Sequence, residues 1–508
     1  MIPLDDDQAP HAVSVYQFIT NMHVAGFVKE YDAGYPNLSR AQVLSFLKEV
    51  ESHSNELSQS ESDILNKLKK TWGKGMITDT HYAQLIGIGE PWITPWYKRF
   101  AEIVSPEKEK IAYFFENPYI NVHVEFLGGY VEAFRLLPSF GESGRIIEGG
   151  LRLRDESASR NELVPQYNFI QGHTRVHVSP TEDMDISLQL AHEPIKLGFG
   201  ESSSLIFSNE TPAFDFVRLD FKYGVFSFAG IYASGVGPFS LDRTKNFSKY
   251  YAVHFVRVAF PKLFSLRVWD IVSYGDRIEL AYFNPLIMFK FIEEALQDRD
   301  NPLFGFDVQF TFIDNLAINF TMLLDDISAN TTGYGNKYAF QANILWYKAF
   351  GISNFSLAFE YTHIRPFVYS HWNPLSSYNH YGTSIGHKAG PNSQNFYLGF
   401  KYYPTHWLNI NFSTALTRSG ENRDETGTFI KDVGRNPLLH PTGLGSLTEA
   451  PFLDGIRLDS YTFTVGIKIE PLRNYIISLN YEHTLKKWLN TETIHSEGWG
   501  YMQLTIEY

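Results

Sequence analysis

The sequence contains no cysteine, which excludes both a disulfide framework and a thiolate metal site. It also lacks any run approaching the ~20 apolar residues that a transmembrane helix needs. Positive charge is in the minority, because 43 Lys and Arg face 56 Asp and Glu and leave a net charge of −13. Non-specific nucleic-acid binding depends on neutralising phosphates, so no nucleic-acid partner is expected for a chain this acidic.

A recognisable export signal is absent too. The residues after Met1 read Ile-Pro-Leu-Asp-Asp-Asp and contain neither a basic n-region nor an apolar h-region. No signal peptide is therefore predicted. If the protein is exported, we expect this to be the mature chain with an added or coincidental Met1.

Aromatic residues, in contrast, are abundant: they make up 16% of the 508 residues, as 41 Phe, 30 Tyr and 9 Trp. Aromatic girdles at the two interfaces of a membrane barrel would accommodate this excess, and so would a large β-sandwich or propeller. The chain is longer than the ~250–300 residues at which a single soluble core stops growing. A barrel escapes that limit because strand number sets its size.

The first hundred residues predict helices. Segment 12–28 has apolar residues near helical spacing. Ser39 with Gln42, and Ser58 with Glu61, form capping boxes, in which two otherwise unbonded N–H groups are satisfied reciprocally. Each capping box opens a stretch with an apolar stripe. The stripes are Val43, Leu44, Leu47 and Val50, then Ile64, Leu65, Leu68 and Trp72. We expect a small bundle whose stripes form mutual core in preference to a docking surface.

From about residue 110 the apolar residues recur with a period of two. Segment 306–312 places three Phe and one Val on one face, opposite Asp, Gln and Thr. The same alternation resumes after Asp314-Asn315, which predicts a β-hairpin. Four further segments follow the pattern: 354–362, 461–469, 477–482 and 502–508.

The chain ends on such a strand, with Tyr508 as its last residue. A soluble sandwich with one wet face would also alternate, but repeated large apolar residues fit a lipid-facing band and the polar face fits a wet lumen. Outer-membrane barrels resemble this ending, since an aromatic residue ends the strand that closes the barrel. We therefore predict a mainly β fold: a large antiparallel transmembrane β-barrel over 106–508, closed at Tyr508, after an N-terminal helical domain at 1–105.

The length of the barrel region predicts its size. Tilted strands of ~9–11 residues with alternating short and long connections give about 16–20 strands. Such a barrel encloses a lumen wide enough for water, so a through-passage and a plug formed by a loop or helix are both open alternatives. The connection 418–458 is polar and rich in Gly, Asp and Pro. It is expected to project outward, since extracellular loops are the longer ones.

Short motifs that resemble catalytic or metal sites lack the surroundings that such sites require. Residues 382–386 match G-x-S-x-G, but a nucleophile elbow needs a strand before it and a helix after it, and the flanks here predict a loop. His192-Glu193 and Asp325-Asp326 have no ligand set at helical spacing. The Gly-rich stretch 198–201 is not followed by a helical pattern. We therefore expect no enzyme, no catalytic residue, no metal site and no cofactor.

Residues 369–395 combine aromatic rings with Asn, Ser and His. Rings can stack on the apolar faces of pyranoses while polar groups bond the hydroxyls, which suits polysaccharide binding. The alternative is that these residues are girdle aromatics and turn formers. The candidate ligand-binding residues are Trp372, Tyr378, His380 and Tyr381.

Three blocks of sequence resemble the Wzi-type capsule-assembly family of outer-membrane proteins. The first, 196–209, resembles a Gly-x-Gly, small residue, Leu-x-x-Ser pattern. The second, spread over 249–326, includes Lys-Tyr-Tyr-Ala-Val-His, Tyr-Gly-Asp-Arg and Leu-Leu-Asp-Asp. The third, 386–393, resembles a Leu-Gly-x-x-x-Gly-Pro-x-Ser loop motif, with Ile385 in place of Leu and with His and Lys inside the loop.

The resemblance implies a barrel of about 18 strands, inside the range estimated from strand length, with a small periplasmic helical domain before it. It also implies a surface lectin that holds capsular or exopolysaccharide through extracellular loops, with the barrel anchored in outer-membrane lipid. Three alternatives stay open. They are a diffusion pore or transporter for small solutes, a membrane-embedded hydrolase using Ser384, and a subunit of a larger envelope assembly. In the last case the helical domain would meet a periplasmic or outer-membrane protein partner.

Overall fold

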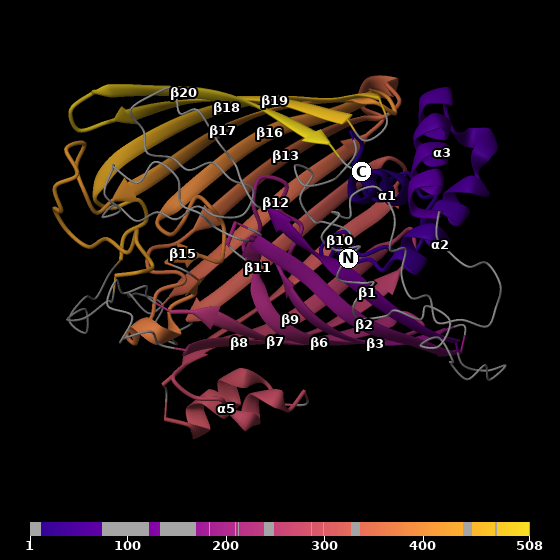
Figure 1. Cartoon of the computed structure of the whole chain (residues 1–508). Helices are drawn as coiled ribbons and strands as arrows, with labels where there is room; N and C mark the ends of the chain where they lie inside the picture. Colours follow the sequence, from indigo (N-terminus) through magenta and orange to yellow (C-terminus); the bar gives the residue numbers. More distant parts are fainter. Residues whose placement is uncertain are drawn as a thin grey trace.

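The computed structural model describes residues 12–73, 121–132 and 169–506, with short gaps at 182, 209, 212, 238–247, 286, 298, 327–335, 381, 440–449 and 473–474. Within these residues sixteen antiparallel strands pair in chain order, and the sheet curves into the wall of a barrel (Figure 1). The predicted fold class, a large antiparallel β-barrel with helices before it, is confirmed. The strands are β1 (Asn121–Glu132), β2 (Phe169–Thr181), β3 (Met184–Glu193), β6 (Phe214–Tyr223), β7 (Phe226–Val236), β8 (Ser248–Phe260), β9 (Phe264–Gly275), β10 (Asn301–Ile313), β11 (Leu316–Asp326), β12 (Lys337–Tyr347), β13 (Phe355–Ile364), β16 (Ser393–Thr405), β17 (Leu408–Glu421), β18 (Ile456–Leu472), β19 (Tyr475–Trp488) and β20 (Ile494–Ile506).

Connections between strands alternate in length, which gives the barrel two unlike ends. At the end that we name the short-turn end, β10 and β11 join through the predicted turn Asp314-Asn315. Asn315 takes a φ of +64°, a left-handed conformation that Asn tolerates. The opposite end, which we name the long-loop end, has four long connections that lie mostly within the described residues: 194–213, 276–300, 365–392 and 422–455.

The last strand returns to the short-turn end. Ile506 of β20 pairs with Tyr475 of β19, next to the connection between β18 and β19. Tyr508, to which the sequence assigns barrel closure, lies outside the described residues. The closure assignment therefore stays a prediction.

Side chains alternate across the wall as the period of two predicts. On β10, Asp307 and Gln309 are almost fully buried inside the barrel, while Phe310 is on the row that faces outward. Rings of neighbouring strands meet on that outer face, as Phe306 and Phe320 do with centroids 6.0 Å apart. A one-residue slip of the strand would exchange the two rows, so burial of the polar row fixes the register.

Residues 12–73 form three helices, as predicted. They are α1 (Val15–Val24), α2 (Arg40–Glu51) and α3 (Gln59–Gly73), with a 3-10 turn, η1 (Ser54–Glu56), between the last two. The Ser39–Gln42 capping box is present. So is the second box, in which Glu61 accepts from the Ser58 N–H at 2.7 Å and Ser58 accepts from the Glu61 N–H at 3.3 Å. Among the described residues, no helix combines the length and apolar character needed to cross a bilayer.

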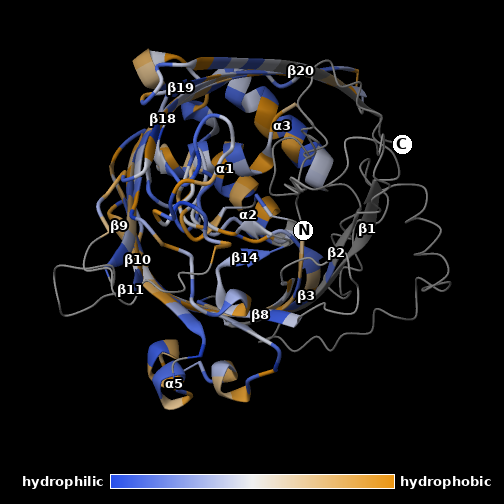
Figure 2. Ribbon diagram, turned by 90° about the vertical axis from the view of Figure 1, so that its left-hand side faces the viewer, coloured by the Kyte–Doolittle hydropathy of each residue, from blue (hydrophilic) through white to orange (hydrophobic). Residues whose placement is uncertain are grey.

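The helices lie within the ring of strands at the short-turn end (Figures 1 and 2). Their apolar stripes pack on each other and on inward residues of the wall, including Leu345, Tyr347 and Tyr403, so one core serves both. Polar groups add to this contact, since Ser356 donates to Asn21 at 2.9 Å. The described helices therefore fill this mouth of the barrel. The proposed boundary near residue 105 lies outside the described residues.

Candidate functional site

The connection 365–392 folds back into the lumen from the long-loop end. It contains η5 (Pro374–Ser376), β14 (Asn379–His380) and β15 (Thr383–Ser384). Its two central tyrosines are fully buried, and their hydroxyls donate to backbone carbonyls of the connection 194–213. Tyr369 donates to Leu205 at 2.8 Å and Tyr378 donates to Ile206 at 3.0 Å. The two connections therefore hold each other inside the barrel.

His380 is enclosed in the same region. Its Nδ1 accepts from the Val236 N–H at 3.0 Å, so its Nε2 must hold the proton that bonds the Ala213 carbonyl at 3.1 Å. Its ring stacks on Phe214 with centroids 4.1 Å apart. Burial lowers the pKa of His380 to about 4, which keeps the ring neutral. This histidine is a structural part of the lumen.

The predicted ligand-binding residues thus separate into different environments. Trp372 is 54% exposed, whereas Tyr378 and His380 are 0% and 1% exposed. The expectation that Tyr378 and His380 touch a glycan is corrected, because their polar atoms and ring faces contact the protein itself. Tyr381 lies outside the described residues. The sequence could not separate these residues, because aromatic and polar residues together suit both sugar contact and burial.

The connection 194–213 bonds the polar inner face of the wall through its backbone. It contains β4 (Lys196–Leu197) and β5 (Phe207–Ser208). The Asn343 side chain donates to the Phe199 carbonyl at 2.7 Å, and Gln341 donates to the Ser203 carbonyl at 2.8 Å. The Glu360 carboxylate accepts from the Glu201 N–H at 2.7 Å. The expectation of a wet lumen is therefore corrected along this part of the wall: its polar residues are buried against the inserted chain.

Motifs that the sequence singled out also have structural partners. Asp325 accepts from the Tyr369 N–H at 2.5 Å, and Lys337 lies 2.6 Å from Asp326. His192 lies 2.7 Å from Asp215. Ser384 belongs to β15, which pairs with β14 in place of opening a helix. No group of three residues able to hold a metal ion occurs within the described part of the chain.

The connection 422–455 lies at the long-loop end and is hydrogen-bonded to the inserted connection 365–392. Arg435 donates to the carbonyls of Ala389 and Pro391, the latter at 3.0 Å, and to Glu421 at 2.8 Å. Asn392 donates to the Asp454 carbonyl at 3.0 Å. Several apolar side chains of this connection are exposed, among them Phe429 at 49% and Ile430 at 54%. The long-loop end therefore combines a fixed loop framework with a few exposed rings.

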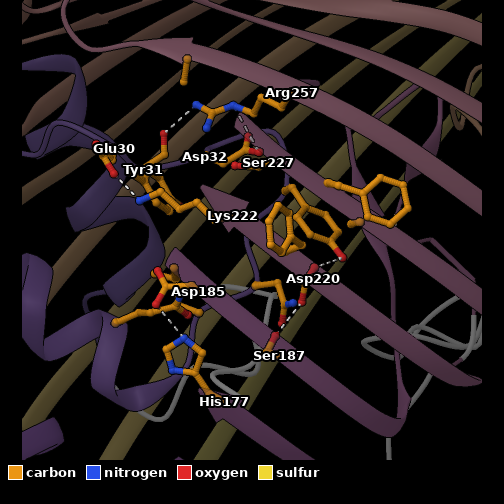
Figure 3. A pocket seen from close by; sticks show the side chains of 18 of the residues that line it. Glu30, Tyr31, Asp32, His177, Asp185, Ser187, Asp220, Lys222, Ser227 and Arg257 are labelled. Carbon is orange, nitrogen blue, oxygen red and sulfur yellow. Dashed lines mark hydrogen bonds and ion pairs between the residues drawn. The ribbon is translucent and has the colours of Figure 1, made fainter. Parts of the chain in front are cut away.

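A cavity of about 470 Å³ lies at the short-turn end, between segment 29–49 and strands β2, β3 and β6–β8 (Figure 3). Several of its polar side chains are paired with each other. His177 lies 3.1 Å from Asp185, and Arg175 lies 3.8 Å from Asp220. Lys222 pairs with Glu30 of the N-terminal segment. No sequence pattern indicated this cavity, because its lining comes from segments far apart along the chain.

Asp32 is the centre of a network of ion pairs between the N-terminal segment and the wall. It lies 2.5 Å from Arg267 and 3.5 Å from Arg257, and Arg267 also lies 3.3 Å from Asp307. Burial alone would raise the pKa of the Asp32 carboxyl, but the two guanidinium groups outweigh it and hold this pKa below its usual value. The cavity charges therefore attach the N-terminal segment to β8 and β9.

Comparison with family profiles finds no match for this chain, and comparison with curated proteins finds none either. Solved structures, however, are similar. Escherichia coli Wzi is described as an outer-membrane protein involved in group 1 capsule assembly and as a carbohydrate-binding β-barrel. The similarity covers 99% of this chain and 98% of that one, with a TM-score of 0.53 and 10% sequence identity. At this identity the comparison confirms the predicted Wzi-type resemblance as a shared fold.

Two further solved structures are similar to a lesser degree. Pseudomonas aeruginosa OprD matches 68% of this chain and 80% of its own, with a TM-score of 0.38 and 9% identity. Acinetobacter baumannii OccAB2 matches 78% of this chain and 89% of its own, with a TM-score of 0.40 and 11% identity.

Proposed function

We propose that this protein is a bacterial outer-membrane β-barrel that binds or organises surface polysaccharide at its long-loop end. One observation carries the proposal: α1–α3 and the connections 194–213 and 365–392 lie in the described part of the lumen and pack on the inner face of the wall. A barrel filled in this way suits an anchor for surface loops better than a diffusion path. The shared fold with a carbohydrate-binding barrel supports the same choice.

The proposal includes an orientation. Outer-membrane barrels have short turns on the periplasmic side and longer loops outside the cell. The short-turn end and its helices would then face the periplasm, where they offer a place for a partner protein. The long-loop end, with the connections 365–392 and 422–455, would face the exterior.

Trp372 is the residue we assign to the glycan. Its indole is 54% exposed, and its neighbour Asn373 is fixed by accepting from the Leu375 N–H at 3.2 Å. A ring held on a fixed loop loses little freedom when a ligand binds, which favours affinity. In this arrangement Tyr378 and His380 act indirectly, by holding the loop from inside the lumen.

A matched pair of tryptophans tests the assignment. Trp407 is 41% exposed but lies in the turn between β16 and β17, at the short-turn end. We expect Trp372→Ala to weaken retention of surface polysaccharide roughly two- to tenfold, the loss of one stacked ring contact of about 0.5–1.5 kcal/mol. Trp407→Ala should leave retention unchanged. Surface glycan is measured on cells that hold equal amounts of folded barrel. Equal retention in both variants would contradict the assignment.

The pore alternative has its own measurement. Single-channel recording in a planar bilayer should show a closed barrel, because α1–α3 and the connections 194–213 and 365–392 occupy the described lumen. Steady, wide conductance from the wild-type protein would favour the diffusion pore and would count against the anchor.

A further inference from the structure

The connection 276–300 differs from the other long connections because it lies outside the barrel. It contains η3 (Leu280–Phe283) and α5 (Phe289–Ala295). Figures 1 and 2 both place α5 beyond the outer surface of the wall, next to β8. The connections 194–213 and 365–392, in contrast, enter the lumen.

This outer connection is a packed structure with its own core. Tyr282, Phe289 and Ile292 are buried against Ala252 and Val272 of the wall. At the base of the connection, Arg277 lies 3.2 Å from Asp300, and the Tyr282 hydroxyl donates to Asp300 at 2.8 Å. These contacts hold the beginning and the end of the connection 276–300 together.

Beneath α5 lie two polar residues on the outward rows of the wall. His254 and Asp270 face each other across β8 and β9. Asp270 accepts from the Phe289 N–H at 2.5 Å, and the His254 ring lies 4.4 Å from the Phe289 ring. Both polar side chains are less than a tenth exposed. Because a charged or polar group on a lipid-facing row is costly, covering the pair with α5 removes it from that environment.

The bare apolar surface below α5 is too short for a membrane strand. On β9 the outward row is exposed at Leu266 and Val268 and is then covered from Asp270 to Tyr274. A membrane strand needs ~9–11 residues. The outer connection itself presents large exposed apolar side chains that extend this surface. They are Ile278, Leu280, Phe283, Ile287, Met288 and Phe291, with exposed fractions between 40% and 77%.

We propose that the connection 276–300 is a lipid-contacting element that lies against the outside of the barrel and meets the acyl chains of the outer leaflet. The inference rests on the proposed outer-membrane location. Its apolar side chains continue the bare rows of β8 and β9, and that continuity selects lipid as the occupant. The strand row and the helix together then form one lipid-facing band.

The absence of native cysteine makes spin labelling at single introduced cysteines a direct test. Labels at Leu280→Cys and Phe291→Cys are compared with two controls in phosphatidylcholine vesicles. Val268→Cys marks the bare outward row, and Phe429→Cys marks a loop in water. Each label is scored by collision with oxygen, which concentrates in hydrocarbon, and with a water-soluble nickel chelate. We expect labels at 280 and 291 to match 268 and to exceed the oxygen-to-nickel ratio at 429 several-fold.

Three other outcomes would overturn either this inference or the proposed membrane location. Labels at 280 and 291 that behave like 429 place the connection in water and overturn the inference, while 268 in lipid leaves the membrane location intact. Labels at 280 and 291 that collide with neither reagent mean that protein, such as a second copy of this chain, covers the patch, which also overturns it. If the label at 268 itself behaves like 429, the membrane location fails.

Discussion

Strands β8 and β9 and strands β10 to β13 form adjacent parts of one wall, yet their faces differ in chemistry. In β10–β13 the inner row holds Gln309 and Asn343, and the outer row is apolar except for His363, which stacks on Phe340. In β8 the inner row holds Val253 and Phe255, which pack on the inserted connections, while the outer row holds His254 beneath α5. The chemistry of each row of side chains therefore matches that of the segment or solvent that the row faces.

The segments inside the barrel are attached to these two parts of the wall in different ways. The N-terminal segment is attached to β8 and β9 by ion pairs around Asp32. The connection 194–213 is attached to β12 by side-chain amides and to β13 by the Glu360 carboxylate, which accepts from backbone N–H groups. Charges respond to pH and to the loss of a partner, whereas amides respond mainly to the loss of a partner. The predictions below use this contrast.

The largest effect is expected for Arg267→Met. Arg267 is about 1% exposed and lies between the carboxylates of Asp32 and Asp307, so its removal leaves the buried Asp307 and the part-buried Asp32 without this partner. Breaking a buried pair in this way costs about 3–5 kcal/mol. Thermal unfolding in detergent should shift strongly downward. Arg418, which lies 3.7 Å from Asp459 and has a 40% exposed side chain, is the control, and Arg418→Met should cost less than about 1 kcal/mol. Equal shifts for both variants would refute the buried network.

A smaller effect is expected for Asn343→Leu on the amide side. The substitution leaves the Phe199 carbonyl without its donor and removes the acceptor of Asn319. One buried unsatisfied group costs about 1–3 kcal/mol. Protease should then cut the connection 194–213 faster. Ile344→Leu changes the next residue, on the outward row, and should leave cleavage as in wild type. Unaltered cleavage in Asn343→Leu would mean that this bond does not hold the connection.

Acid should loosen the charged attachment and spare the amide attachment. Because the pKa of Asp32 is lowered in the folded protein, its contribution is present above the usual aspartate value near 3.9 and is lost as pH falls through the lower folded value. Pepsin, which works in acid, should cut segment 12–73 more readily over that range, with 194–213 protected for longer. Asp32→Asn should be looser at neutral pH and should flatten the pH dependence. A variant with the wild-type pH dependence would exclude Asp32 as the titrating group.

Much of the fold was predictable because it depends on local patterns. Capping at Ser39 and Ser58, the turn at Asp314-Asn315 and the alternation in 306–322 each depend on residues close along the chain. Strands β8 and β9 are harder to recognise, because both of their faces are covered over part of their length. Burial on both faces removes the alternation that identifies a strand.

The candidate site was predictable only in part. Composition identified the connection 365–392, and one of its selected residues, Trp372, is exposed. Composition could not show that Tyr378 and His380 turn inward, because their partners, Ile206, Val236 and Ala213, are remote in sequence.

The sequence by itself determined the periods of two and 3.6, the caps and turns, and the contrast between long and short connections. These depend on steric and hydrogen-bonding preferences within a few residues. Only the tertiary structure decided which connections enter the lumen, which one lies on the outer wall, and which polar residues are satisfied by backbone rather than by water. These outcomes depend on contacts between distant segments, such as Asp32 with Arg267 or Phe289 with Asp270, that become neighbours only when the wall curves into a barrel.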